Sequence, residues 1–198
     1  MRKIKWVRTV LVVFLVFAFA GIGFGEENFK NPEEVVRAFI LQRAKYSFFM
    51  KETEYANYCR KVISFISNGE KYFDEYCGGG VPIIRDFSII NSSIKGDHGE
   101  IIVEHNFCGI CANDLSCLPE KKSEKGTYKL IKKDGFWKIE KWYSESCPFP
   151  CDGWISIKEV IRLYDFILST YSKFKYLGSK EEIKQTVSKL KKSCMEVK

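Results

Sequence analysis

Two features of this chain could carry chemistry: a closely spaced cysteine pair and a histidine on an apolar strand. Cys108 and Cys111 form a Cys-x-x-Cys motif that follows the apolar segment 101–103. A thiol at the start of a helix has a lowered pKa, because the helix dipole stabilises its thiolate, and it then attacks disulfides. The spacing therefore predicts, as one interpretation, a thiol–disulfide oxidoreductase that uses Cys108 and Cys111.

His105 is the second candidate. It alternates with Ile101, Val103 and Phe107, and a strand would place all four side chains on one face. A histidine in a pocket can act as a general acid or base near neutral pH. The other interpretation is a histidine that is hydrogen-bonded within the sheet and has no catalytic role.

The full set of cysteines predicts a cross-linked protein. It comprises Cys59, Cys77, Cys108, Cys111, Cys117, Cys147, Cys151 and Cys194. An even number of cysteines in an exported chain is typical of a disulfide framework. We expect a bond between the clusters 108–117 and 147–151, a bond between Cys59 and Cys77, and a bond from Cys194 to a remaining cluster cysteine. We expect no metal and no other cofactor, because oxidation competes with thiolate ligation outside the cytoplasm.

The N-terminus has the three parts of a secretory signal. Four basic residues lie among the first eight positions, an uncharged apolar run covers 10–24, and small residues extend to Gly25. This order is typical of a signal peptide, here residues 1–25. The alternative is an uncleaved anchor, although its 15 residues are fewer than the roughly 20 that a spanning helix needs. Both alternatives predict an extracytoplasmic protein, periplasmic or secreted, that contacts a membrane only through this segment.

The charge of the remaining chain is nearly balanced. Without residues 1–25 it has 28 basic and 25 acidic residues. The two signs are interspersed, as in segment 121–125, which is typical of a solvated surface. Proteins that bind nucleic acid concentrate Lys and Arg in one patch, so we expect no nucleic-acid partner.

Helices are expected at both ends of the mature chain. Asn31, Pro32 and Glu34 form a helix start, and apolar residues at helical spacing continue it to about Ala44. Further helical segments are expected at 52–66 and 70–76. Near the C-terminus, Ser156 and Ser179 each begin a capping box, which predicts two helices, the first of them ending at Gly178.

Strands are expected between these helices. Segments 83–90 and 99–107 are followed by 127–132 and 136–143, and the last two flank Asp134–Gly135, a dipeptide typical of a tight hairpin. A cysteine-rich loop is expected over 108–125. The sequence thus predicts an α+β fold, with N-terminal helices packed on a curved four-stranded antiparallel sheet and two C-terminal helices.

This order of elements resembles the nuclear transport factor two-like, or cone-fold, superfamily over residues 30–144. The resemblance rests on the helix start at residues 31–34 and on the hairpin strand 134–139, which reads Asp-Gly-Phe-Trp-Lys-Ile. It implies a conical pocket between the helices and the sheet. The pocket residues that it implies are Phe39, Val103, His105, Tyr128, Leu130, Trp137 and Ile139.

We therefore expect three segments: a signal peptide at 1–25, a cone-like domain at 26–152, and a helical appendage at 153–198. The expected role is to bind a small apolar ligand or a partner protein of the cell envelope, without catalysis. The alternatives are the oxidoreductase with Cys108 and Cys111 and a cone-fold enzyme that uses His105.

Overall fold

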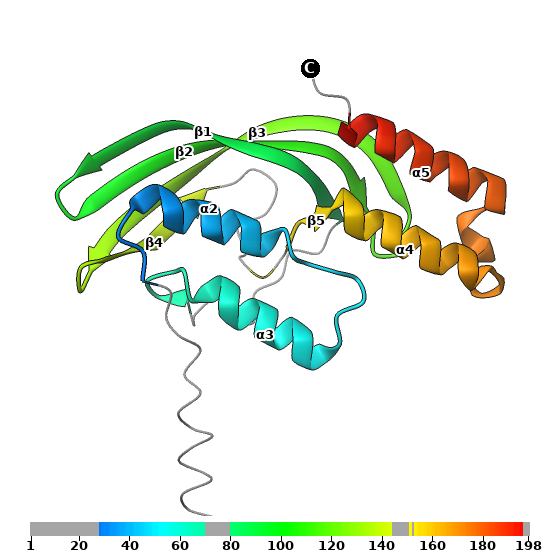
Figure 1. The fold of residues 1–198 in the computed structure, drawn as a ribbon, viewed down its shortest axis with the longest axis horizontal. Helices are drawn as coiled ribbons and strands as arrows, with labels where there is room; N and C mark the ends of the chain where they lie inside the picture. The colour runs from blue at the N-terminus through cyan, green and yellow to red at the C-terminus, as the bar shows by residue number, and fades with distance from the viewer. Residues whose placement is uncertain (1–27, 70–79, 144–150, 152, 196–198) are drawn as a thin grey trace, which may run out of the picture.

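Five strands form one strongly curved sheet that arches over helix α2 (Figure 1). The computed structural model describes residues 28–69, 80–143, 151 and 153–195. Its elements are α2 (Pro32–Arg43), α3 (Glu52–Ile63), β1 (Val81–Lys95), β2 (His98–Cys111), β3 (Cys117–Lys133), β4 (Phe136–Tyr143), β5 (Ile155–Ser156), α4 (Ile157–Ser169), the 3-10 turns Tyr171–Lys173 and Lys175–Leu177, and α5 (Lys180–Met195). The signal segment, the expected helical turn 70–76, Cys77 and Cys147 lie outside the described residues.

The sheet has the order β4-β3-β2-β1-β5. The first four strands are antiparallel to their neighbours, as expected. The prediction of a four-stranded, purely antiparallel sheet is wrong, because β5 adds a parallel strand beside Ile83 and Ile84. A strand of two residues immediately before a helix cap has too few positions to show an alternating pattern.

The strands are longer than the pattern predicted. β2 continues through Cys111, and β3 begins at Cys117, so the expected cysteine-rich loop over 108–125 is mostly strand. Residues 118–123 of β3 are all exposed. Their charges indicate solvent contact, and they lack the apolar alternation by which a strand is recognised.

The tight turns follow their sequence signals. Gly96 has a φ of 59° between β1 and β2, and Asp134 and Gly135 have φ values of 51° and 84° between β3 and β4. Two successive residues with positive φ match the twist of the flanking strands in a two-residue hairpin. The hairpin predicted at Asp134–Gly135 is therefore confirmed.

The predicted helix caps are also present. Asn31 accepts a hydrogen bond from the Glu33 backbone N–H at 2.9 Å, and Ser156 accepts one from Glu159 at 3.3 Å. α4 ends at Ser169, well before the predicted end near Gly178. The reason is local: the hydroxyls of Ser169 and Thr170 both donate to the Phe166 carbonyl, at 2.8 and 2.7 Å, and such bonds compete with the helical ladder.

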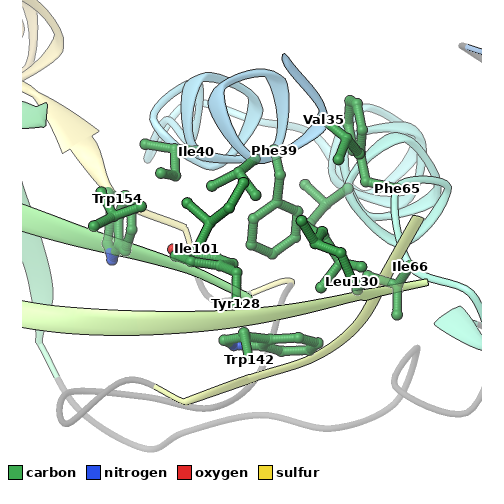
Figure 2. Close-up of a cluster of buried hydrophobic side chains, with 14 of the residues drawn as sticks. Val35, Phe39, Ile40, Phe65, Ile66, Ile101, Tyr128, Leu130, Trp142 and Trp154 are labelled. Carbon is green, nitrogen blue, oxygen red and sulfur yellow. The ribbon is translucent and has the colours of Figure 1, made fainter. Parts of the chain in front are cut away.

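Two hydrophobic cores use opposite faces of the sheet. The first lies between the sheet and helices α2 and α3, and Figure 2 shows Phe39 pointing from α2 toward Tyr128. The second lies among α4, α5 and the region of the sheet that carries the cysteines. Phe107 belongs to the first core and its neighbour Cys108 to the second, because successive strand residues point in opposite directions.

Candidate functional site

The two cysteines of the Cys-x-x-Cys motif are not bonded to each other. Cys108 forms a disulfide with Cys194, and Cys111 forms one with Cys117. Both motif cysteines are fully buried within β2. The predicted oxidoreductase site needs its first cysteine at a helix N-terminus, and a strand supplies no helix dipole to activate the thiol. The structure therefore contradicts the proposed redox pair.

The other cysteine expectations have mixed outcomes. The expected bond from Cys194 to a cluster cysteine is confirmed, and its partner is Cys108, since α5 packs against β2 and β3. The expected bond between the two clusters is wrong, because Cys108, Cys111 and Cys117 are all used elsewhere. Cys111 and Cys117 are direct cross-strand neighbours. The loop expected over 108–125 does not predict this proximity. The expected partner of Cys59 lies outside the described residues.

His105 lies in the centre of the first core and has no exposed surface. Its Nε2 atom lies 3.0 Å from the Tyr128 hydroxyl oxygen, and its ring centre lies 4.9 Å from that of Trp154. Gly126 makes room for the ring, because a Cβ atom there would lie 2.4 Å from His105 Cε1. The histidine is thus held on all these sides by packed side chains.

Arg43 and Glu124 accompany this histidine and were missed in the sequence. Arg43 is 1% exposed, and its guanidinium carbon lies 4.3 Å from the centre of the Trp154 ring and 5.8 Å from that of Phe39. Glu124 is 3% exposed and stands opposite His105 in the β2–β3 register. The sequence holds a signal for each residue. Arg43 lies four positions after Phe39, on the same face of the helix, and Glu124 lies four positions before Tyr128, on the same face of the strand.

Burial and the nearby charges hold His105 neutral. Loss of hydration lowers its pKa from 6.5 to about 4, the positive charge of Arg43 acts in the same direction, and Glu124 opposes both. Burial likewise raises the pKa of Tyr128. A neutral histidine–tyrosine pair closed off by side chains has no access to a substrate, so the enzyme interpretation that rests on His105 gains no support.

This lowered pKa predicts that His105 makes stability depend on pH. Between pH 6.5 and about 4, the unfolded chain binds a proton that the folded chain does not. The free energy of unfolding should therefore fall by about 3 kcal/mol as the pH drops through this range. Urea unfolding at several pH values measures this fall, and in His105→Gln it should be smaller by that amount.

His98 is the matched control for this experiment. It is exposed at the start of β2, and His98→Gln should keep the pH dependence of the unsubstituted protein. Equal slopes in His105→Gln and the unsubstituted protein would show that His105 is hydrated in the folded state.

All seven residues implied as a ligand pocket are brought together by the fold. They are Phe39, Val103, His105, Tyr128, Leu130, Trp137 and Ile139, and each is at most 4% exposed. They contact one another as a packed core: the ring centres of Phe39 and Tyr128 are 6.0 Å apart. Trp154 fills the end of this core beside Arg43 (Figure 2). Their own side chains thus occupy the space in which a ligand was expected.

The Trp154 segment is fixed to the end of α2. The Arg43 carbonyl accepts hydrogen bonds from the Trp154 N–H at 3.0 Å and from the Tyr58 hydroxyl at 3.1 Å. Gly153 approaches Tyr46 so closely that a Cβ atom would lie 2.2 Å from the Tyr46 Cβ. These contacts anchor the indole in place, with 1% of its residue surface exposed.

A groove open to solvent lies at the other end of the sheet. Its volume is about 320 Å³, and it is lined by Ser93, Lys95, His98, Gly99, Glu100, Lys129, Leu130 and Glu140. Its lining includes both acidic and basic side chains, and it is separate from the buried histidine. It is open to solvent, unlike the enclosed apolar cavity that a small apolar ligand requires.

Four aromatic side chains form a continuous row, of which three are exposed and Phe174 is half-buried against the second core. Their ring centres are separated by 5.3 Å from Phe49 to Phe166, by 5.9 Å from Phe166 to Phe174, and by 6.2 Å from Phe174 to Tyr176. Phe49 is 36%, Phe166 45% and Tyr176 63% exposed. We call these four residues the aromatic row. Arg162 lies over the Phe49 ring at 5.7 Å, which gives the row a basic flank.

Comparison with known proteins identifies no family for this chain. No protein-family model matches it, and no curated protein matches it. Among the described residues, none of the helices has the length and apolar character needed to cross a bilayer. One solved structure that it resembles in part is the intermembrane-space region of the chloroplast protein ARC6, with a TM-score of 0.38, 11% identity, and coverage of 57% of this chain and 92% of that one.

Proposed function

We propose that this protein is an extracytoplasmic binding module with a cone-type fold, and that it docks a partner protein of the cell envelope through the aromatic row. The observation that carries the proposal is the row itself. Exposed aromatic side chains that contact one another are costly in water and are enriched in protein–protein contact sites. Phe49, Phe166 and Tyr176 supply such a surface from three different segments.

The disulfides support the extracytoplasmic location. Cys108–Cys194 and Cys111–Cys117 are buried bonds within the second core. Bonds of this kind persist in oxidising compartments and are rare in the cytoplasm. The N-terminal signal pattern supports the same location, and the signal is proposed to be removed near residue 25.

The packing of the first core favours a protein partner over a small ligand. Arg43, His105 and Trp154 fill the interior in which the resemblance implied a pocket. The aromatic row, in contrast, is accessible, and Arg162, which also pairs with Glu159 at 3.7 Å, lies over its Phe49 ring. The expected partner surface therefore carries apolar side chains that cover these rings.

Site-specific photo-crosslinking in intact cells tests this function. A photoreactive phenylalanine analogue at position 166 should give one discrete adduct with an envelope protein, and Tyr176→Ser in the same chain should reduce its yield severalfold, because the neighbouring hot-spot contact is lost.

Leu41 supplies the control position, since it is 55% exposed on α2 and lies outside the row. The analogue at position 41 should give no such adduct. Equal adducts from positions 41 and 166, or none from position 166, would contradict the proposed docking surface.

A further inference from the structure

The two edges of the sheet differ in how much of their backbone is hydrogen-bonded to covering segments. The outer edge of β4 is covered, because Trp137 donates to the Phe29 carbonyl at 2.8 Å and Ile139 donates to the Phe65 carbonyl at 2.9 Å. Among the described residues, the outer edge of β1 is covered by β5 at Ile83 and Ile84 alone. Within the described chain, residues 85–95 of β1 make no backbone hydrogen bond on that side. We call residues 85–95 the open edge.

The open edge has few of the features that normally prevent strand addition, and the bulge between Ile89 and Asn91 is one that it does have. It is long, contains no proline, and has no charged residue from Phe87 to Ile94. Ile90 and Ile94 are 47% and 42% exposed. Natural proteins protect such edges with prolines, charges or covering segments, since unpaired N–H and C=O groups are a template for another strand. Figure 1 shows that the tip of the β1–β2 hairpin extends beyond helix α2.

From these observations we infer that the open edge pairs with the open edge of a second copy of this chain, antiparallel and about a two-fold axis between Ile90 and Asn91. The charges at the two ends favour this register. It sets Asp86 of each copy opposite Lys95 of the other, and the symmetry creates two such pairs. Within its own chain the Asp86 carboxylate already contacts Arg85 at 2.6 Å and accepts from Asn106 at 2.6 Å, so Lys95 would add a second cation beside it. An extended peptide of another protein would need a cation opposite Asp86 and an anion opposite Lys95, and a second copy of this chain supplies both.

The irregularity in β1 makes the register geometrically consistent. A bulge between Ile89 and Asn91 shifts the pairing with β2 by one residue. Phe87, Ile89, Ser92 and Ile94 therefore share the sheet face of Val103 and Ile101, while Ser88, Asn91 and Ser93 share the other face. In the proposed register Phe87 meets Ile94, Ile89 meets Ser92 and Ser88 meets Ser93, each on its own face, as antiparallel pairing requires. The bulged residue Ile90 lies at the axis.

The inference stands apart from the proposed function, because it concerns a second copy and a strand that lies outside the aromatic row. The two surfaces use different residues, so a failure of one leaves the other intact. Crosslinking at position 166 tests the heterologous partner, whereas self-association of the purified protein tests the open edge.

Sedimentation equilibrium of the full-length oxidised protein, from about 1 µM to about 1 mM, should show a reversible monomer–dimer equilibrium. Asp86→Lys and Lys95→Glu should each raise the dissociation constant about tenfold or more, because both symmetric pairs become repulsive. The double variant should recover most of the original affinity, since it exchanges the two signs, although a lysine at position 86 no longer pairs with Arg85. Amides within 86–95 should gain protection from hydrogen exchange as concentration rises.

Matched controls lie two strands away from the edge. Glu120→Lys and Lys125→Glu reverse exposed charges on β3, and they should leave the dissociation constant unchanged. A protein that stays monomeric at about 1 mM would overturn the inference, because a dissociation constant above that value is weak even for a small transient interface. The edge would then be left to a different kind of partner. A dimer that the double variant does not restore would overturn the register.

Discussion

Replacement of Cys108 and Cys194 together with alanine is expected to lower the free energy of unfolding by about 4 to 5 kcal/mol. The bond joins residues 86 positions apart, and the entropy that a cross-link removes from the unfolded chain grows with the length of the loop it closes. Cys111 and Cys117 are only 6 positions apart, so their double alanine variant should lose about 2 kcal/mol by the same rule. Chemical denaturation of both variants measures the difference.

The comparison between the two variants is its own control. Each removes one buried disulfide of the second core, so the transfer of two sulfur atoms from the core is similar in both. What differs is loop length, and with it the attachment of α5 to the sheet. Equal losses would show that chain entropy does not govern these bonds and that local packing sets their contribution.

Local signals carried most of the correct fold prediction. Asn31, Ser156 and Ser179 were recognised as caps because each makes its hydrogen bond within three residues, as Ser179 does with Glu182. The Asp134–Gly135 turn was recognised because a positive φ restricts residue type. Caps and tight turns depend on residues only a few positions apart, so a single sequence is enough to predict them.

Long-range pairing was not accessible in the same way. Nothing near Cys108 distinguishes Cys194 as its partner from Cys111, because the choice depends on which sheet face each thiol occupies and on where α5 packs. The bulge between Phe107 and Gly109 places Cys108 and Cys111 in the same core although they are three residues apart, which simple alternation does not predict. The length of β3 was underpredicted for a different reason. Its exposed residues 118–123 carry no alternation of apolar and polar side chains, so their sequence looks like that of a solvated loop.

The buried charges were missed because composition rules count Arg and Glu as surface residues. Arg43 and Glu124 each fall on a stripe of apolar positions, where a charge is informative. The sequence therefore located the first core and its histidine, but it could not show whether the space beside them was empty. Trp154, from a segment assigned to the helical appendage, fills it.

Trp154→Ala is expected to lower the free energy of unfolding by about 4 kcal/mol, because a large buried ring is removed and a cavity remains. Indole added at about ten times its dissociation constant should restore about 1.4 kcal/mol, since it binds the folded state alone. Removal of the ring also admits water to His105, and its pKa should rise from about 4 toward its ordinary value. Denaturation with and without indole, and NMR titration of His105, are the measurements.

Trp154→Phe separates the ring's volume from the rest of the substitution. Phenylalanine keeps the space occupied, so this variant should be only modestly destabilised and should gain nothing from indole. If Trp154→Ala also gains nothing, the interior collapses when the ring is removed and has no latent capacity for a ligand. If indole restores Trp154→Ala, the curved sheet encloses a volume that can hold a small aromatic molecule, and Trp154 is what excludes one. The second outcome would identify Trp154 as the residue that keeps the interior of this curved sheet filled.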